Sequence, residues 1–513
     1  MMRAAAAALA IAQPQNGLID NVTGYTLDDQ GRLKRFNGLL IDSSGKVVQL
    51  LNPGEKPQGT LSFRLDGGRR ILIPGLADAH GHLMALGLRA MRLDLTDASS
   101  LTAMQARLSA WAGSHNAPKW IVGYGLDPTA MGMSRLPTTA DLDVISGGRP
   151  VWLIRADGTA GVANSAALAE AGITASTSAP PDGRIERGAG GRPNGALFGS
   201  AMALIERAVP PALPIEREAA LIKAQDQLLA SGLTSVTDIG TTVDDWMTFR
   251  RAGDLGRLRV RVMAYAAGID PLLTIAGTGP TPWLYDGKLR MAGVVLDDQA
   301  VLDSGATRLG DAQLRNLMSR AAMDSFQVAV EADGGNATSQ VIGAIDELAE
   351  TYKGERRWRI ERSRPIDPVN KASVDRLQII ATSVPVRFAF VGGAPAPDRR
   401  IAYGSDFPLA PPNPFAGIAA AMTAAGVPAE TAIAGFSINA AYAGRAEDKL
   451  GSLMPGHWAD FLLIDRDIFR LVPAEIAATR VLESWVGGKR AWVAPPAPAA
   501  APSVPQPSQE RWR

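Results

Sequence analysis

The stretch LIPGLADAHGHLMALG, residues 72–87, joins an apolar run to two histidines that are one residue apart. In a β-strand, residues i and i+2 project from the same face, so His80 and His82 are expected to point at one spot. Imidazole is the commonest metal ligand in proteins. We therefore interpret this stretch as a strand that ends in two candidate metal ligands.

Apolar runs alternate with helical patterns from about residue 72 to 445, which is typical of repeated βα units around a parallel sheet. With the strand that ends at His80, the pattern predicts eight inward strands. The other seven cover residues 233–240, 259–266, 289–297, 326–333, 358–363, 377–384 and 400–407. Eight such units predict a (β/α)8 barrel, with functional residues at the carboxyl ends of its strands.

Short alternating runs separated by turn residues flank this region and indicate β-strands within residues 18–71 and 446–493. Residues from about 95 to 200 are too many for one crossover and indicate an insertion after the first strand. Residues 1–17 suggest either a shortened export signal or an Ala-rich disordered start, so a periplasmic and a cytoplasmic location both stay open. The Pro/Ala/Ser-rich residues 494–513 are expected to be disordered.

The composition restricts the partners and the metal ligands. The 513 residues are 46% hydrophobic and 20% charged, as in a folded globular protein. A formal net charge of +1 gives no electrostatic case for nucleic acid or an anionic membrane surface, and no apolar run has the length of a membrane span. Cysteine is absent, so a metal would need histidine, carboxylate or other nitrogen and oxygen donors. The expected partner is a small molecule.

Four segments carry a resemblance to a known family: PGLADAHGHLMALG (74–87), DGTAGVANSAAL (157–168), YGSDFPLAPPNPF (403–415) and GSLMPGHWADFLLIDRD (451–467). Together they resemble the amidohydrolase superfamily, in the branch that contains N-substituted formamide deformylase. The similarity runs in order from about residue 18 to 493. It implies a metal-bearing (β/α)8 barrel over residues 72–445 and a small β-sandwich built from residues 18–71 and 446–493.

The family binds one or two divalent metals that activate water against an amide or related bond. Its ligands are a His-x-His pair on strand 1, a lysine or glutamate on strand 4, one histidine each on strands 5 and 6, and an aspartate on strand 8. Carried over to this chain, the resemblance assigns metal binding to His80, His82 and Asp406. It also gives Asp406 the role of catalytic base.

Four family positions are substituted in this chain. They are Val295 for the strand-4 lysine, Glu331 and Arg362 for the two single histidines, and Thr159 for a substrate-facing histidine in the insertion. The remaining histidines of the chain, His115 and His457, lie in turn-like contexts and are expected to be exposed. They cannot replace the missing ligands.

These substitutions leave at most one divalent metal, zinc or a similar ion, or none. Val295 has no donor atom to bridge two metals, whereas Glu331 could add an oxygen ligand. Arg362 cannot ligate a metal and would place a permanent charge at the site, where it could pair with Glu331 instead. The connection at residues 385–398 is also short and rich in proline and glycine, so the barrel is expected to lack an outer helix there.

Two functions remain open at this point. The resemblance implies a metal-dependent hydrolase of non-peptide carbon–nitrogen bonds, with an eroded site. The ligand substitutions favour the alternative, a catalytically inactive pseudoenzyme on the amidohydrolase fold that binds a small molecule, because a fold does not by itself confer an activity.

Overall fold

The computed structural model describes residues 16–57, 59–115, 119–297, 309–332, 335–361, 368–388 and 401–496. Its centre is an eight-stranded sheet with the order β21-β20-β19-β18-β17-β16-β15-β8. The strands are β8 (Leu76–Gly81), β15 (Leu233–Thr241), β16 (Arg261–Ala267), β17 (Leu289–Asp297), β18 (Gln327–Glu331), β19 (Arg359–Glu361), β20 (Ile380–Ser383) and β21 (Ala402–Tyr403). All neighbouring pairs are parallel. The predicted barrel with eight parallel strands is confirmed.

The barrel closes between β21 and β8 through main-chain hydrogen bonds just beyond the end of β21. The amide of Asp406 donates to the carbonyl of His80 at 2.8 Å, and the amide of His82 donates to the carbonyl of Phe407 at 3.0 Å. The buried carboxylate of Asp78 accepts from the amide of Ser405 at 3.1 Å. These bonds bring the ends of the first and eighth strands together.

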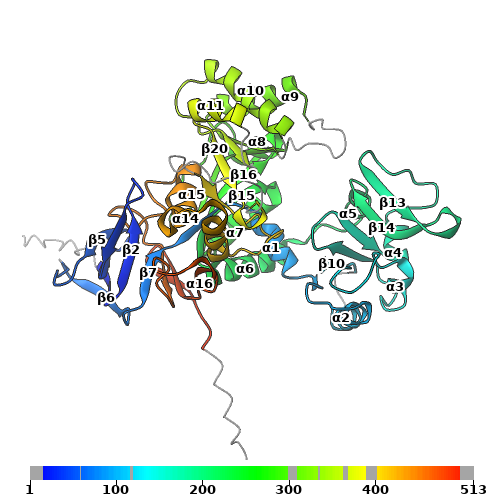
Figure 1. Ribbon diagram of the computed structural model, residues 1–513, viewed down its shortest axis with the longest axis horizontal. Helices are drawn as coiled ribbons and strands as arrows, with labels where there is room; N and C mark the ends of the chain where they lie inside the picture. Colours follow the sequence, from blue (N-terminus) through cyan, green and yellow to red (C-terminus); the bar gives the residue numbers. More distant parts are fainter. Residues whose placement is uncertain are drawn as a thin grey trace, which may run out of the picture.

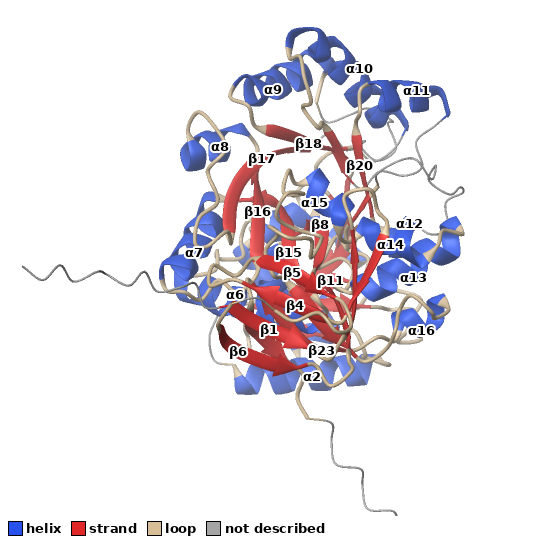
Figure 2. Ribbon diagram, turned by 90° about the vertical axis from the view of Figure 1, so that its left-hand side faces the viewer, coloured by secondary structure: helices blue, strands red, loops and turns tan. Residues whose placement is uncertain are grey.

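Helices follow the strands and lie on the outside of the barrel (Figure 2). They are α6 (Pro214–Ala230), α7 (Val243–Asp254), α8 (Ile269–Ala276), α9 (Asp311–Met323), α10 (Gly335–Thr351), α11 (Pro368–Arg376), α13 (Pro414–Ala425) and α14 (Ala429–Gly435). A further helix, α15 (Ile438–Ala443), packs against β8 and β21, and the carbonyl of its Ala443 accepts from the buried side chains of Gln327 and Arg359. In α6, Leu221, Ala224 and Leu228 recur at helical spacing and are buried against the barrel, after a proline in the first turn.

The connection between β20 and β21 contains a short helix, α12 (Pro385–Phe388). Residues 389–400 lie outside the described part of the chain, so the predicted loss of an outer helix at 385–398 stays a prediction.

Both ends of the chain build a β-sandwich beside the barrel, in blue and red in Figure 1. One sheet has the order β5-β4-β1-β6 and the other β24-β23-β22-β7-β2-β3. The strands are β1 (Asn16–Asp20), β2 (Thr23–Leu27), β3 (Leu33–Phe36), β4 (Gly38–Ile41), β5 (Val47–Leu51), β6 (Leu61–Asp66), β7 (Ile71–Pro74), β22 (Phe461–Ile464), β23 (Val481–Val486) and β24 (Lys489–Val493), with α16 (Pro473–Ala477) between β22 and β23. Ile19, Leu39, Phe461 and Trp485 share the core between the two sheets.

The segment after β8 leaves the barrel through α1 (Leu83–Arg89) and forms a separate lobe, on the right of Figure 1. Its sheet has the order β13-β14-β12-β11-β10-β9. The elements are β9 (Leu93–Asp94), α2 (Leu101–Ser114), β10 (Ile121–Leu126), α3 (Thr139–Asp143), β11 (Val151–Arg155), β12 (Ala160–Ala163), α4 (Ser165–Glu170), β13 (Gly183–Arg187), β14 (Pro193–Gly199) and α5 (Met202–Glu206). In the described part of the chain, no helix combines the length and apolar character that a membrane span requires.

Candidate metal centre

His80 lies at the end of β8 and His82 directly follows that strand, and both rings are held by their Nδ1 atoms. Nδ1 of His80 is 2.7 Å from Oε2 of Glu361, and Nδ1 of His82 is 2.7 Å from the carbonyl oxygen of Ile239. An ionised carboxylate and a carbonyl only accept hydrogen bonds, so each Nδ1 carries a proton. This tautomer leaves the lone pair on Nε2, which is the arrangement that metal-binding histidines use.

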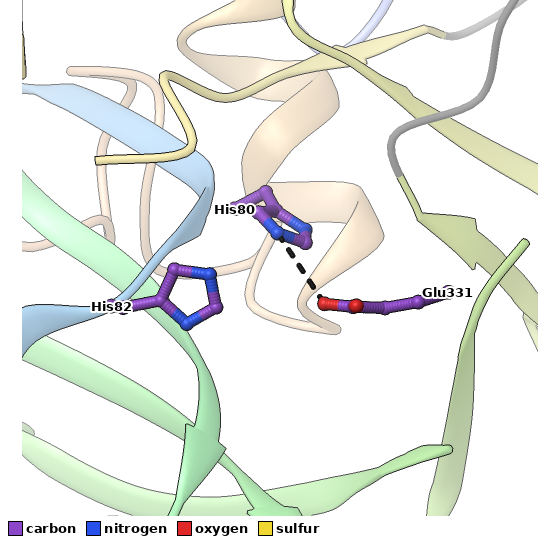
Figure 3. A group of neighbouring side chains, drawn as sticks. All are labelled: His80, His82 and Glu331. Carbon is purple, nitrogen blue, oxygen red and sulfur yellow. Dashed lines mark ion pairs between the residues drawn. The ribbon is translucent and has the colours of Figure 1, made fainter. Parts of the chain in front are cut away.

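The two Nε2 atoms face carboxylate oxygens across a small space, and Figure 3 shows His80, His82 and Glu331 around it. Nε2 of His80 is 3.7 Å from Oδ1 of Asp406 and 3.9 Å from Oε1 of Glu331. Nε2 of His82 is 3.4 Å from the same oxygen of Asp406. One ligand atom from each of His80, His82 and Glu331 lies within 4.8 Å of the others.

These distances fit one divalent cation. Two ligand atoms bound tetrahedrally to zinc are about 3.4 Å apart, so small side-chain shifts would complete the coordination. Within the described residues, the buried Nε2 of His80 has no hydrogen-bond partner. Because a buried polar atom without a partner is costly, a group that binds this nitrogen would be favoured at this place.

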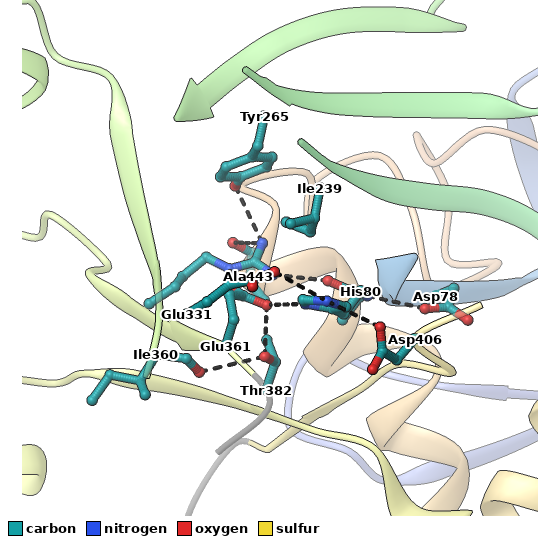
Figure 4. A network of polar contacts seen from close by, with 12 residues as sticks. Asp78, His80, Ile239, Tyr265, Glu331, Ile360, Glu361, Thr382, Asp406 and Ala443 are labelled. Carbon is teal, nitrogen blue, oxygen red and sulfur yellow. Dashed lines mark hydrogen bonds and ion pairs between the residues drawn. The ribbon is translucent and has the colours of Figure 1, made fainter. Parts of the chain in front are cut away.

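A buried ionic network lies behind His80 (Figure 4). Glu361 also accepts from Nε of Arg359 at 2.6 Å and from the hydroxyl of Thr382 at 2.7 Å. The side chains of Arg359 and Glu361 are fully buried. Burial alone would raise the pKa of Glu361, but the charge of Arg359 and the hydrogen bond from His80 outweigh it and lower the pKa to about 2. Glu361 is therefore ionised and fixes the ring of His80.

Asp406 has a left-handed backbone with φ of 55° and a fully buried side chain. Its carbonyl accepts from the amide of Leu409 at 3.0 Å, so it is also a turn residue. Its Oδ2 accepts from Nη1 of Arg387 on α12 at 2.6 Å, while Oδ1 faces the histidines. The two carboxylate oxygens thus have different neighbours.

Val295, which the resemblance assigns to the position of the family's strand-4 lysine, packs against Ile239, Tyr265 and Ala329 inside the barrel. It has no atom that could ligate or bridge metals. Arg362 lies outside the described residues, and so does the predicted pair between Arg362 and Glu331.

Thr159 is exposed on the insertion, where its hydroxyl donates to Asp157 at 2.8 Å. A Cβ atom built on the preceding Gly158 would lie 3.5 Å from the side chain of Leu409, so this loop reaches the segment that follows Asp406.

The expected exposure of the other two histidines is confirmed for one of them and wrong for the other. His115 is exposed, as expected. The expectation for His457 was wrong, because His457 is only 7% exposed. Its two ring nitrogens lie 3.1 and 2.9 Å from the carbonyl oxygens of Met454 and Glu447, and these contacts allow a histidine to be buried in a turn.

The sequence interpretation missed Arg359, Glu361 and Arg387. A usable signal was present for the first two: they occupy alternate positions of the predicted strand 358–363 and so share one face. Two opposite charges on one face of an otherwise apolar barrel strand indicate a buried ion pair. No comparable pattern pointed to Arg387.

The electrostatic environment favours a positive charge. Burial would lower the pKa of His82, but the carboxylates of Asp406 and Asp238 outweigh it and raise that pKa. Burial raises the pKa of both Asp78 and Asp238 to about 6. These acidic groups favour a positive charge beside His82, and a bound divalent cation would supply one.

Comparison with known proteins identifies the family of this chain. Residues 66–491 match the model of the Amidohydrolase family. The chain is 26% identical to the putative amidohydrolase YtcJ of Bacillus subtilis, covering 88% of this chain and 94% of that protein. It is 25% identical to the N-substituted formamide deformylase of Arthrobacter pascens, covering 83% and 89%. It is also 28% identical to the protein LONG AFTER FAR-RED 3 of Arabidopsis thaliana, covering 84% of each.

The fold also matches solved structures. An uncharacterized metal-dependent hydrolase from Pyrococcus horikoshii superposes with a TM-score of 0.72 at 19% identity, covering 90% of this chain and 99% of the other. A second, from Pyrococcus furiosus, gives 0.71 at 22% identity, covering 89% and 100%. The family match extends over most of the sequence and includes every segment of the barrel and the site. The chain belongs to the amidohydrolase family.

Proposed function

We propose that this protein is a hydrolase of non-peptide carbon–nitrogen bonds that works with one divalent metal, zinc or a similar ion. The observation that carries the proposal is the convergence of Nε2 of His80 and Nε2 of His82 on one carboxylate oxygen of Asp406, with both Nδ1 atoms occupied elsewhere. Glu331 is the further candidate ligand. The relative that hydrolyses N-substituted formamides suggests amides of this kind as first substrates to test.

A bound divalent cation supplies a Lewis acid, which acidifies water and polarises a carbonyl group. In the proposed reaction, Asp406 accepts the proton of the attacking water at Oδ1. The water oxygen bonds to the carbonyl carbon, the carbon–nitrogen bond breaks, and Asp406 returns the proton to the leaving amine. Arg387 would keep the carboxylate oriented through Oδ2.

The second candidate is a metal-free binding protein. Its support is Val295, which offers no donor, and the cation of Arg387 beside Asp406. Metal content separates the two candidates directly.

We expect purified protein to contain about one equivalent of zinc, manganese or iron by elemental analysis, and His80→Ala and His82→Ala to lose it. His115→Ala is the matched control, because it removes an exposed histidine outside the cluster and should retain the metal. The metal-loaded protein should hydrolyse N-formyl or N-acyl amines, and activity should disappear with a chelator. Less than a tenth of an equivalent after incubation with each metal would favour the binding protein instead.

A further inference from the structure

A cavity lies outside the candidate metal centre, where the insertion meets the barrel. It has a volume of about 390 Å³, in the range of small-molecule sites. Its wall combines α1, which begins directly after His82, the loop that follows Asp406, and β9 and β10 of the insertion. A ligand there would touch both parts of the protein.

Two arginines supply the charge of this cavity. The guanidinium carbons of Arg89 and Arg92 lie 5.7 and 5.6 Å from the ring centre of the same aromatic residue, Tyr124. Arg89 donates to the carbonyl of Pro408, and Arg92 donates to the hydroxyl of Tyr124. Both partners are uncharged.

One carboxylate, that of Asp94, also lines the cavity. It accepts hydrogen bonds from the amide and hydroxyl of Thr96, at 2.9 and 2.6 Å. Burial would raise the pKa of Asp94, but these hydrogen bonds and the charges of Arg89 and Arg107 outweigh it and lower that pKa, so Asp94 offsets part of the charge of Arg89. The formal charge of the wall is +1, from two arginines and one aspartate. Each guanidinium has five N–H donors, so both keep donors for a ligand.

The rest of the wall is largely apolar. Leu86 and Leu93 lie on the side of α1 and β9, and Pro408, Leu409 and Pro411 lie on the side of the loop. A cavity that combines apolar walls with a few convergent polar groups is typical of sites for small organic ligands. Arginine forks match the planar geometry of a carboxylate.

We propose that this cavity binds a small organic carboxylate, with the carboxylate between Arg89 and Arg92 and the apolar body against the leucine and proline wall. The inference does not depend on the proposed hydrolase activity, because none of these groups belongs to the metal cluster. It is therefore tested on metal-free protein, so that its failure and the failure of the metal proposal are separate results.

The experiment is isothermal titration calorimetry of the full chain after chelation, with benzoate, hexanoate and 4-phenylbutyrate, each paired with its primary amide. We expect at least one carboxylate to bind, and its amide to bind at least about 10-fold more weakly, because a charge-assisted hydrogen bond is lost. Arg92→Gln and Arg89→Gln should each weaken the carboxylate about 10-fold or more. Arg92→Lys, which keeps the charge but loses the fork, should give a smaller loss.

Arg107→Gln is the matched control. Arg107 lies on α2 and donates to the carbonyl of Asp94 at 3.4 Å, but does not line the cavity. The Arg107→Gln variant should bind the carboxylate as the wild type does. Unchanged melting temperatures would show that all variants are folded. Three results would overturn the proposal: no carboxylate binds, acid and amide bind equally, or Arg107→Gln weakens binding as much as Arg92→Gln. Binding of inorganic phosphate alone would reject the organic carboxylate as well.

Discussion

Glu361 determines the chemistry of His80 through a single hydrogen bond. By accepting from Nδ1, it holds the proton on the inner ring nitrogen and directs Nε2 to the candidate metal position. The same carboxylate compensates the buried charge of Arg359. One residue that is not itself a candidate ligand thus supports both the stability of the barrel and the geometry of its site.

We expect Glu361→Gln to lower the free energy of unfolding by about 3–5 kcal/mol, because it leaves a buried arginine without its counter-charge. His80, Arg359 and Thr382 all donate hydrogen bonds to the carboxylate of Glu361. The side-chain NH2 group of a glutamine would therefore face a donor instead of accepting from it. Metal affinity should fall about 10–100-fold. Urea unfolding and metal titration measure the two effects. Glu447→Gln, at the partly exposed pair with Arg357, should cost less than about 1 kcal/mol; equal losses would contradict this account.

At the scale of elements, the segment after β21 closes the barrel and carries Asp406 in the same few residues. Gly404 makes this contact possible. A Cβ atom at this position would lie 2.6 Å from the backbone nitrogen of His80, so only glycine lets the two strands approach this closely.

Gly404→Ala should therefore move β8 relative to the loop after β21. We expect a loss of about 1–3 kcal/mol in stability, as for other overpacked cores, and weaker metal binding because His80 moves. Gly343→Ala, in α10, is the control: its Cβ would meet nothing within 4 Å, and the change should be neutral or stabilising by up to about 1 kcal/mol. Retained metal affinity in Gly404→Ala would show that closure does not position the ligands.

The connection after β22 is held by Asp465. Burial would raise its pKa, but hydrogen bonds from Arg466 and Arg480 outweigh it and lower the pKa to about 2, from an ordinary 3.8. A lowered native pKa contributes stability in full above about pH 4, and this contribution is lost as the pH falls towards 2.

Asp465→Asn should accordingly reduce the free energy of unfolding by roughly 1–2 kcal/mol at neutral pH, allowing for the exposure of the arginines. The difference from wild type should shrink between about pH 4 and pH 2. Urea unfolding across this pH range tests it, with the exposed Asp29→Asn as control. If the stability difference between Asp465→Asn and wild type stays constant down to pH 2, the lowered pKa of Asp465 is not its cause.

At the scale of the whole molecule, one buried ion pair joins the barrel to the sandwich. Arg261 on β16 contacts both carboxylate oxygens of Asp460, at 2.6 and 2.8 Å, and its guanidinium carbon lies 3.8 Å from the ring centre of Trp458. The side chains of Arg261 and Asp460 are 1% and 5% exposed, so water stabilises neither charge and each charge is stabilised mainly by the other.

Asp460→Asn should lower stability by about 3–5 kcal/mol, because Arg261 would keep its charge in the interior. Calorimetric unfolding should show a clearly lower melting temperature. Asp346→Asn removes a similar contact to Arg376 between half-exposed side chains and should change stability by less than about 1 kcal/mol. If the two variants melt together, the buried pair does not hold the barrel and sandwich together.

The sequence could predict the barrel because the periodicity of its strands is a local property. The run at residues 289–297 agrees with β17 at both ends. Of residues 401–407, the described part of the strand predicted at 400–407, only Ala402–Tyr403 pair as a strand, because the following residues form the turn that carries Asp406. The position where a strand ends depends on the segments that pair with it. The local periodicity of the sequence therefore does not predict strand ends.

By itself, the sequence determined the parallel barrel, the family resemblance and the pairing of His80 with His82, since each depends on residue types at short spacing. Only the tertiary structure decided that Glu361 fixes the ring of His80, that Arg387 contacts Asp406, and that Arg89 and Arg92 meet in a cavity with Tyr124. Some of these contacts join residues that are distant in the chain. Others depend on the direction in which a side chain points, as for the two arginines that line the cavity. Such relations arise from packing, and no short stretch of sequence encodes them.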